Sequence, residues 1–309
     1  MENVKIPYVY ITGSSFSGST LLSFLLNSHQ QMVSISEVQG PIKNVVLDKY
    51  LCSCGELFLR CPFYLELEKR INELGGSFTL KDWHTKFLIY DHKWLNYFFV
   101  RPLRNSFLER IRDILVPLWP GYQKKIDNTC RQNVMLARSV LTISNKQIFV
   151  DAQKDSMRIK YFQESDKLDL YVIHLVRDVR GGVASIMKNL NINNVVKATK
   201  IWYTKNMNSE RARRYVPPSR WFRLAYDDLC ADTQGTIDRI SDFVGCKRVT
   251  VPKNFYDSEH HIIGNRMRLT ISGDIKRDDS WKKRLNQEDL KIIARIAGEA
   301  NHFFGYDWP

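Results

Sequence analysis

The sequence has few cysteines and lacks a long apolar run. Six cysteines in 309 residues are too few for a scaffold held together by disulfides. No run of roughly eighteen apolar residues occurs, which argues against a membrane-spanning helix. The first residues also lack the basic stretch and apolar segment of a secretory signal. We therefore expect a protein of the reducing cytoplasm that has no membrane partner.

Internal repeats, low-complexity segments and Pro/Gly-rich linkers are also missing, which favours one domain over residues 1–309. Acidic residues are fewer than basic ones: the sequence has 33 Asp and Glu but 46 Lys and Arg, so its net charge is +13. This excess predicts an anionic partner. The charge is scattered along the chain, and no nucleic-acid recognition motif is present. A pocket for a small anion is therefore favoured over a nucleic-acid track.

The order of apolar runs predicts an α/β fold. Continuous apolar runs at 8–12, 147–150, 170–176 and 221–226 are typical of buried parallel strands, and helical patterns lie between them. This alternation predicts a parallel β-sheet flanked by helices. Residues from about 41 to 145 interrupt it with a mostly helical, aromatic-rich insertion. We expect this insertion either to form a cap that binds a small molecule or to form a helical core of its own.

The strongest motif is YVYITGSSFSGSTLLSFLL, at residues 8–26. A buried strand runs into a Gly/Ser-rich loop that opens directly into an apolar helix. This arrangement directs free backbone N–H groups and the positive end of a helix dipole at a phosphate. Gly13 and Gly18 permit close approach of the backbone. The loop residues that we assign to phosphate binding are Ser15, Phe16, Ser17, Gly18, Ser19 and Thr20.

The same loop argues against a nucleoside-triphosphatase. Gly13 and Gly18 have the spacing of a P-loop, but Ser19 stands where the P-loop lysine should be. The sequence also shows no obvious acid that would hold magnesium after an apolar strand. An ATP-dependent kinase with a degenerate loop therefore remains only as an alternative.

A second motif, LYVIHLVRDVRGGVASIMKN at residues 170–189, places Arg177 at the carboxyl end of a predicted strand. Ligands of α/β sheets bind at such ends. Ser185 follows eight residues later on the next helix. A guanidinium fork and a hydroxyl suit a second phosphate group. The alternative for Arg177 is a surface ion pair with Asp178.

Together the two motifs resemble the 5′-phosphosulfate loop and the 3′-phosphate element of sulfotransferases that use 3′-phosphoadenosine 5′-phosphosulfate (PAPS). Supporting segments resemble the bacterial-type members of that family, and residues from about 65 to 145 remain unmatched. These segments are CSCGELFLRCPFY (52–64), VDAQKDSMR (150–158), FRLAYDDLCAD (222–232), HHIIGNRMRL (260–269) and DDSWKKRL (278–285).

The resemblance implies a sulfotransferase that moves the sulfonyl group of PAPS by in-line displacement and leaves adenosine 3′,5′-bisphosphate (PAP). The acceptor would be a hydroxyl or amine of a small molecule such as an alcohol, a phenol, an amine or a sugar. The resemblance also implies that Arg266 and Arg268 add cations for the 3′-phosphate or the adenine. The scheme requires no metal, and we assign no metal ligand for it.

One departure from the family pattern concerns Phe16, which stands where most members carry a Lys or Arg. Lys154 follows the strand 147–150 and is expected to supply the missing cation to the leaving phosphate. Glu37, about one short strand beyond the helix that starts at Thr20, is the expected general base. The histidines at 29, 92 and 260 remain alternative bases.

Three of the cysteines, Cys52, Cys54 and Cys61, lie close together in the sequence. A structural zinc site needs four ligands, and this segment offers only three. We therefore expect small buried side chains in a compact loop rather than a zinc site.

Overall fold

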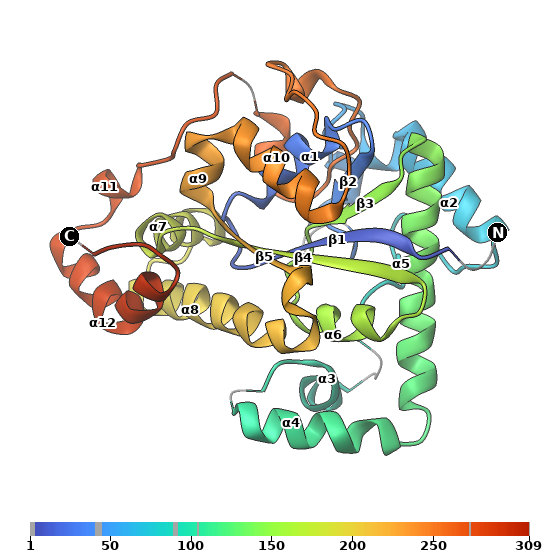
Figure 1. The fold of residues 1–309 in the computed structure, drawn as a ribbon, viewed down its shortest axis with the longest axis horizontal. Helices are drawn as coiled ribbons and strands as arrows, with labels where there is room; N and C mark the ends of the chain where they lie inside the picture. The colour runs from blue at the N-terminus through green and yellow to red at the C-terminus, as the bar shows by residue number, and fades with distance from the viewer. Residues whose placement is uncertain (1–3, 41–44, 89–91, 104, 272, 309) are drawn as a thin grey trace.

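The computed structural model describes residues 4–40, 45–88, 92–103, 105–271 and 273–308. These residues form a five-stranded sheet in the order β2-β3-β1-β4-β5, and every neighbouring pair of strands is parallel. The strands are β1 (Ile6–Thr12), β2 (Met32–Ser36), β3 (Ile148–Asp151), β4 (Leu168–Val176) and β5 (Trp221–Ala225). The expected α/β fold with a parallel sheet is thereby confirmed (Figure 1).

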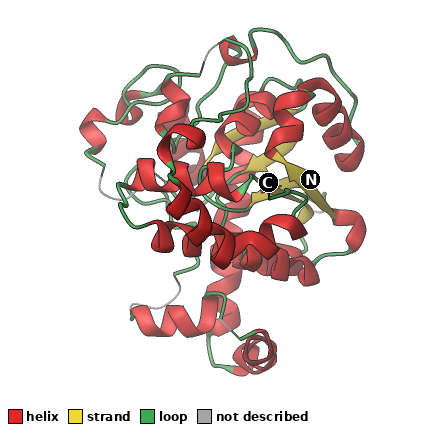
Figure 2. Cartoon of the chain, turned by 90° about the vertical axis from the view of Figure 1, so that its left-hand side faces the viewer, coloured by secondary structure: helices red, strands yellow, loops and turns green. Residues whose placement is uncertain are grey.

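Helices cover both faces of the sheet, because the strands carry apolar side chains on both faces. Val9 and Ile11 of β1 point to one face and pack with α1 (Ser19–Asn27) and α10 (Thr233–Val244). Tyr8 and Tyr10 point to the other face and pack with α5 (Tyr122–Ser144) and α6 (Met157–Glu164). The two layers are visible edge-on in Figures 1 and 2.

A third apolar cluster lies at the β4–β5 side of the sheet. There α7 (Val179–Leu190), α8 (Val195–Ala212) and the C-terminal α12 (Gln287–Phe303) pack around the buried Trp202. The short helices α9 (Tyr226–Ala231) and α11 (Trp281–Arg284) complete this end of the chain. No helix in the described ranges has both the length and the apolarity needed to cross a membrane.

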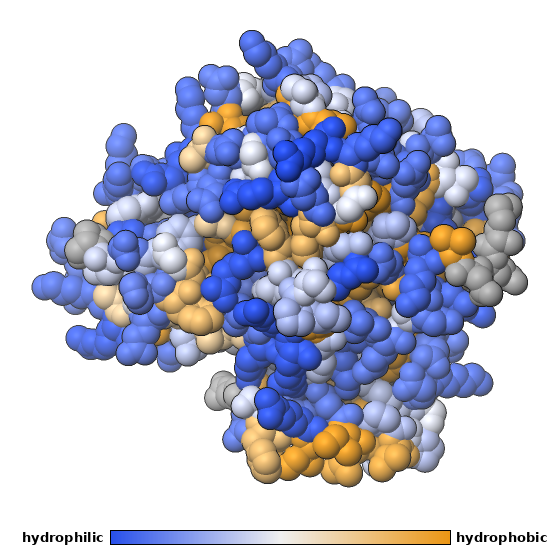
Figure 3. Space-filling view, viewed as in Figure 1, coloured by the Kyte–Doolittle hydropathy of each residue, from blue (hydrophilic) through white to orange (hydrophobic). Residues whose placement is uncertain are grey.

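The aromatic-rich insertion is mainly helical over its described residues. It comprises α2 (Pro62–Glu73), α3 (Lys93–Val100), α4 (Ser106–Leu115) and α5, while its first residues, 41–44, lie outside the described ranges. Its aromatic residues divide into two groups. Trp83 and Tyr122 are buried in the core, whereas Trp94 and Phe107 on α3 and α4 are largely exposed. The exposed group forms an apolar surface on the arm that extends below the body of the molecule (Figure 3).

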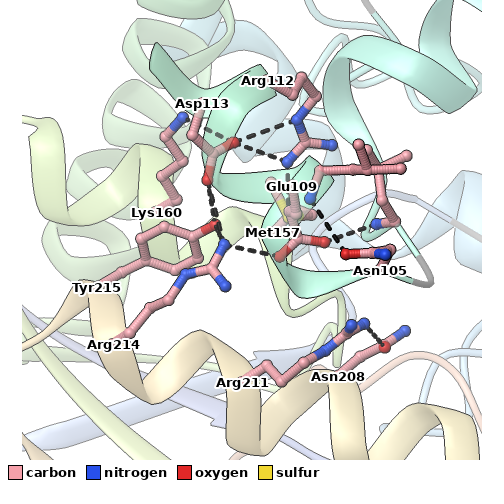
Figure 4. Close-up of polar contacts among 12 residues, drawn as sticks. Asn105, Glu109, Arg112, Asp113, Met157, Lys160, Asn208, Arg211, Arg214 and Tyr215 are labelled. Atoms are coloured by element: carbon pink, nitrogen blue, oxygen red, sulfur yellow. Dashed lines mark hydrogen bonds and ion pairs between the residues drawn. The ribbon is translucent and has the colours of Figure 1, made fainter.

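Polar contacts hold α4 on the body of the molecule, as Figure 4 shows. Asp113 accepts a hydrogen bond of 2.6 Å from the Tyr215 hydroxyl and pairs with Lys160 of α6 at 3.3 Å. Glu109 pairs with Arg214 at 2.8 Å. These partners lie on α6 and on the 3-10 turn Arg213–Tyr215, outside the set of candidate site residues. The acceptor-binding role expected for the insertion stays a prediction.

Candidate active site at the carboxyl edge of the sheet

Each of the five strands ends at a candidate site residue. The phosphate loop follows β1, Glu37 follows β2, Lys154 lies three residues beyond β3, Arg177 follows β4, and Tyr226 follows β5. Because all five strands are parallel, their carboxyl ends lie at one edge of the sheet, where α/β proteins bind ligands. The topology therefore gathers residues that are as far apart as 15 and 226 in the sequence.

The phosphate loop depends on its two glycines. Gly13 has φ 136°, and a Cβ there would lie 2.3 Å from the carbonyl oxygen of Leu175. Gly18 has φ 99°, and its Cβ would lie 2.5 Å from the ring of Tyr226. Phe16 also has a positive φ, 64°, which is costly for a bulky side chain, and its ring packs against the α7–α8–α12 cluster. The loop is thus held in its conformation by close contact with β4 and Tyr226.

The loop presents backbone donors at the start of α1. Gly18 is the N-cap of this helix, and no side chain caps it, so the N–H groups of the first turn are available to an anion. Ser19 and Thr20 are buried beside them. Ser14 donates its N–H to the Asn206 side chain at 3.1 Å, which fixes the loop to α8. Its own hydroxyl is buried and has no hydrogen-bond partner among the described residues.

The Ser17 hydroxyl has a different role from the expected one. It donates a 2.9 Å hydrogen bond to the carbonyl oxygen of Ser14 and so braces the loop from within. In this state its proton is directed at the backbone, not at an anion. Ser15 is only partly buried.

Arg177 and Ser185 lie together, as their spacing predicts. Arg177 is 6% exposed, and its Nη1 donates to the Ser185 hydroxyl at 3.2 Å. The expected alternative, a pair with Asp178, is not formed, because Asp178 pairs with Arg180. Instead, Nη2 of Arg177 donates to the backbone carbonyl of Asp278 at 2.6 Å and to its carboxylate at 3.1 Å.

The carboxylate of Asp278 therefore occupies an anion position on Arg177. Burial alone would raise the pKa of Asp278, but hydrogen bonds from Ser280 and Arg177 lower it overall. Asp278 is thus ionised at neutral pH. Sequence reasoning assigned no role to this residue, although it lies in the DDSWKKRL segment.

Tyr226 connects the two anion-binding elements, and sequence reasoning did not single it out. Its ring contacts the backbone of Gly18 on one side of the site. The guanidinium of Arg177 stacks on the same ring at 4.7 Å from its centroid. Burial raises the pKa of Tyr226, so that its hydroxyl stays neutral. One neutral ring therefore lies against both the phosphate loop and Arg177.

Glu37 and Lys154 form an ion pair, with 3.5 Å between Oε1 and Nζ. Both side chains are largely but not fully buried, at 21% and 15% exposure. Strand β2 has an irregular register between Ser34 and Ser36, which turns the chain into Glu37. Gly264 lies against the carboxyl group so closely that a Cβ there would be 2.9 Å away. The structure thus brings together the two residues that sequence analysis assigned to catalysis.

Arg268 does not fit the expected cofactor role. Its side chain is buried, and its Nε, Nη1 and Nη2 atoms donate to the carbonyl oxygens of Leu51, Gly264 and Asn265. The guanidinium thus holds its own loop against residue 51 instead of offering a fork to a phosphate. Arg266, in the same turn, is exposed.

Two of the alternative bases are occupied by other contacts. The ring of His29 contacts the Lys247 carbonyl at 2.9 Å and accepts from the N–H of Gln31 at 3.0 Å. The ring of His260 contacts the Ser53 hydroxyl and the Tyr256 carbonyl, both at 2.8 Å. Neither ring has a free nitrogen for a substrate proton, whereas Glu37 has only Lys154 as its ionic partner among the described residues. His92 is exposed before α3.

Comparison with known proteins agrees with this arrangement. Residues 169–250 match the model of a sulfotransferase family, and this segment contains Arg177, Ser185 and Tyr226. No curated protein is a significant sequence match. The structure resembles the sulfotransferase domain of the Synechococcus PCC 7002 olefin synthase, with a TM-score of 0.53, 19% identity, and coverage of 99% of this chain and 97% of that one.

A second similar structure is the sulfotransferase domain from the curacin biosynthetic pathway. Its TM-score is 0.52 at 16% identity, and the alignment covers 99% of this chain and 100% of that one. At these identities the likeness concerns the fold. The family match over residues 169–250 and the fold shared with these sulfotransferase domains agree with the sulfotransferase that the sequence motifs indicate.

Proposed function

We propose that this protein is a sulfotransferase that moves the sulfonyl group of PAPS to a hydroxyl or amine of a small-molecule acceptor and releases PAP. One observation carries the proposal: two anion-binding elements, the uncapped start of α1 and the Arg177–Ser185 pair, both lie against the Tyr226 ring. PAP carries two separate phosphates, and these elements supply one site for each.

In this proposal the loop residues 15–20 bind the 5′-phosphosulfate through backbone N–H groups and the hydroxyls of Ser19 and Thr20. Arg177 and Ser185 bind the 3′-phosphate, for which Arg177 exchanges its contact with Asp278. Arg266, which is exposed on the nearby turn, remains available to the nucleotide. These contacts hold the donor in line with the acceptor, and such positioning supplies up to roughly 7–11 kcal/mol of the barrier reduction.

Glu37 and Lys154 divide the chemical step. The acceptor oxygen or nitrogen forms a bond to sulfur while the bond from sulfur to the bridging phosphate oxygen breaks. Lys154 stabilises the negative charge that develops on that oxygen. Glu37 takes the acceptor proton. Their 3.5 Å contact is the resting state of this pair, and the ammonium leaves it for the nucleotide when the donor binds.

The test is transfer from labelled PAPS to a panel of alcohols, phenols, amines and sugars, without added magnesium. We expect a labelled product from at least one acceptor class, and binding of PAP in calorimetry. Glu37→Gln should bind PAP normally and lose transfer by about 10²-fold. Magnesium-dependent ATP binding without PAP binding would instead establish the kinase alternative. A sugar as the sole acceptor would identify a carbohydrate sulfotransferase.

A cytoplasmic location belongs to the same proposal. It is supported by the six free cysteines, which pair in no disulfide in the described parts of the chain. Fractionation of cells that express the tagged chain tests it.

A further inference from the structure

The three clustered cysteines acquire a fourth neighbour in the fold. Cys52, Cys54 and Cys61 lie around the start of α2, and His261 comes from a loop 200 residues beyond Cys61. The four potential ligand atoms, three Sγ and the His261 Nδ1, all lie within 4.8 Å of one another. From these residues we infer that the chain binds a structural zinc ion through three cysteines and one histidine.

The distances match the edges of a zinc tetrahedron. Zinc–sulfur bonds of about 2.3 Å and zinc–nitrogen bonds of about 2.0–2.1 Å place two sulfurs about 3.8 Å apart, and a sulfur and a nitrogen about 3.6 Å apart. The Sγ atoms of Cys54 and Cys61 are 3.7 Å apart. Nδ1 of His261 is 3.3 Å from Cys61 Sγ and 3.8 Å from Cys52 Sγ. The other pairs of ligand atoms lie within 4.8 Å, so an ion at the centre would have to draw them together by about 1 Å at most.

The surroundings of His261 present the correct nitrogen. Its Nε2 faces the carboxylate of Glu259 at 3.4 Å, which favours the tautomer with Nε2 protonated and the Nδ1 lone pair directed at the sulfurs. The imidazole stacks on Phe63 with 4.3 Å between ring centroids. The Tyr64 hydroxyl donates to its backbone carbonyl at 2.5 Å. The ring is thus held in place by groups on α2, the helix that begins after Cys61.

The ligand types select zinc over harder cations. Thiolates favour zinc or iron over magnesium and calcium, and three sulfurs with one imidazole nitrogen form a known type of structural zinc site. Four protein ligands fill the tetrahedron and leave no position for a substrate.

Zinc at this position would support the neighbourhood of Glu37. Ser53, between two of the ligands, pairs with Ile262, whose N–H donates to the Ser53 hydroxyl at 2.7 Å. The next residue, Ile263, donates its N–H to the Ile35 carbonyl at 3.1 Å and so attaches to β2. Gly264 then lies against the Glu37 carboxyl group. The ion would fasten this loop at the place where the proposed base emerges from the sheet.

Elemental analysis of the full chain, purified under reducing conditions with any affinity tag removed, tests the inference. We expect about one zinc per chain in the unaltered protein and less than about a fifth of that in Cys54→Ser and His261→Asn after dialysis against a competing chelator. The matched control is Cys246→Ser, which removes a thiol that lies 4.0 Å from the ring of His29, and it should keep its zinc.

Two further measurements use the unaltered chain, in case the variants fail to fold. X-ray absorption at the zinc edge should show three sulfurs and one nitrogen. Stripping the metal should speed hydrogen exchange of the Ile263 amide by at least about tenfold, because the loop loses its fastening. A folded, reduced chain that takes up no zinc, one iron per chain in place of zinc, or a Cys54–Cys61 disulfide in the native protein would each overturn the inference.

Discussion

Replacement of Arg177 by alanine tests the proposed 3′-phosphate site most directly. The guanidinium is buried, lies 3.2 Å from the Ser185 hydroxyl and stacks on Tyr226. We expect the Arg177→Ala variant to bind PAP more weakly and to fold normally. The side chain that loses its partner, Asp278, is 47% exposed, so water can replace the lost contact.

The expected magnitude follows from two opposing terms. A unit charge about 4 Å from the phosphate contributes about 4 kcal/mol at an effective dielectric constant of about 20. Before it can bind, Arg177 must release the half-exposed carboxylate of Asp278, a contact worth about 0–1 kcal/mol. Truncation of a buried charged partner in other complexes costs about 2–5 kcal/mol. We therefore expect a loss of about 2–4 kcal/mol, or about 30- to 900-fold in Kd.

The assay compares calorimetric affinities for PAP and for adenosine 5′-phosphate, which lacks the 3′-phosphate. The Arg177→Ala variant should lose affinity for PAP and bind adenosine 5′-phosphate as the unaltered protein does. Arg220→Ala is the matched control, because Arg220 also pairs with a carboxylate, Asp169 at 2.8 Å, and stacks on a tyrosine ring at 3.9 Å. It precedes β5 and so lies at the opposite edge of the sheet.

Two results would refute the reasoning. Equal losses for the two nucleotides would mean that Arg177 shapes the site without binding the 3′-phosphate. Unchanged affinity of Arg177→Ala for PAP, together with loss of PAP binding in Ser185→Ala, would show that the 3′-phosphate is bound without Arg177.

Three further predictions concern the ion pair, the loop and pH. Glu37→Gln and Lys154→Ala should each lower kcat more than they weaken PAP binding. In the double variant the two losses in kcat should not multiply, because the two groups are 3.5 Å apart. Steady-state kinetics of the unaltered protein, both single variants and the double variant would contradict this if the losses multiplied. Gly18→Ala should abolish PAP binding, because its Cβ would overlap the tyrosine ring beside the loop, whereas Gly245→Ala, at φ 78° with open space around it, should bind PAP normally in the same titration. Burial lowers the pKa of His174, so the unfolded chain takes up a proton there before the folded chain does. The free energy of unfolding in urea should therefore be largest above about pH 6.5 and should fall as the pH drops below that value. This histidine contributes at most about 1.4 kcal/mol per pH unit to the fall. If the free energy of unfolding of His174→Gln depended on pH in the same way, this histidine would be excluded as the cause.

The sequence by itself determined the parts of the site that are local in the chain. The β1–loop–α1 unit is one continuous stretch, so its apolar strand, its glycines and its apolar helix could be read in order. Arg177 and Ser185 are likewise close in the sequence, because Arg177 directly follows a strand and Ser185 lies in the first turns of the next helix. Outside the insertion, the alternation of strands and helices predicted the parallel sheet, because parallel strands require helical crossovers.

Tertiary structure decided the contacts between residues that are distant in the sequence. Nothing near Tyr226 in the chain indicates that its ring touches Gly18, and nothing near Arg268 indicates that its donors are used by backbone carbonyls. Packing alone assigns such partners, because a side chain has no short-range signal for a group a hundred or more residues away. The cysteines show this most clearly: three ligands were visible in one segment, and the fourth, His261, reaches them only because its loop follows the edge of β2.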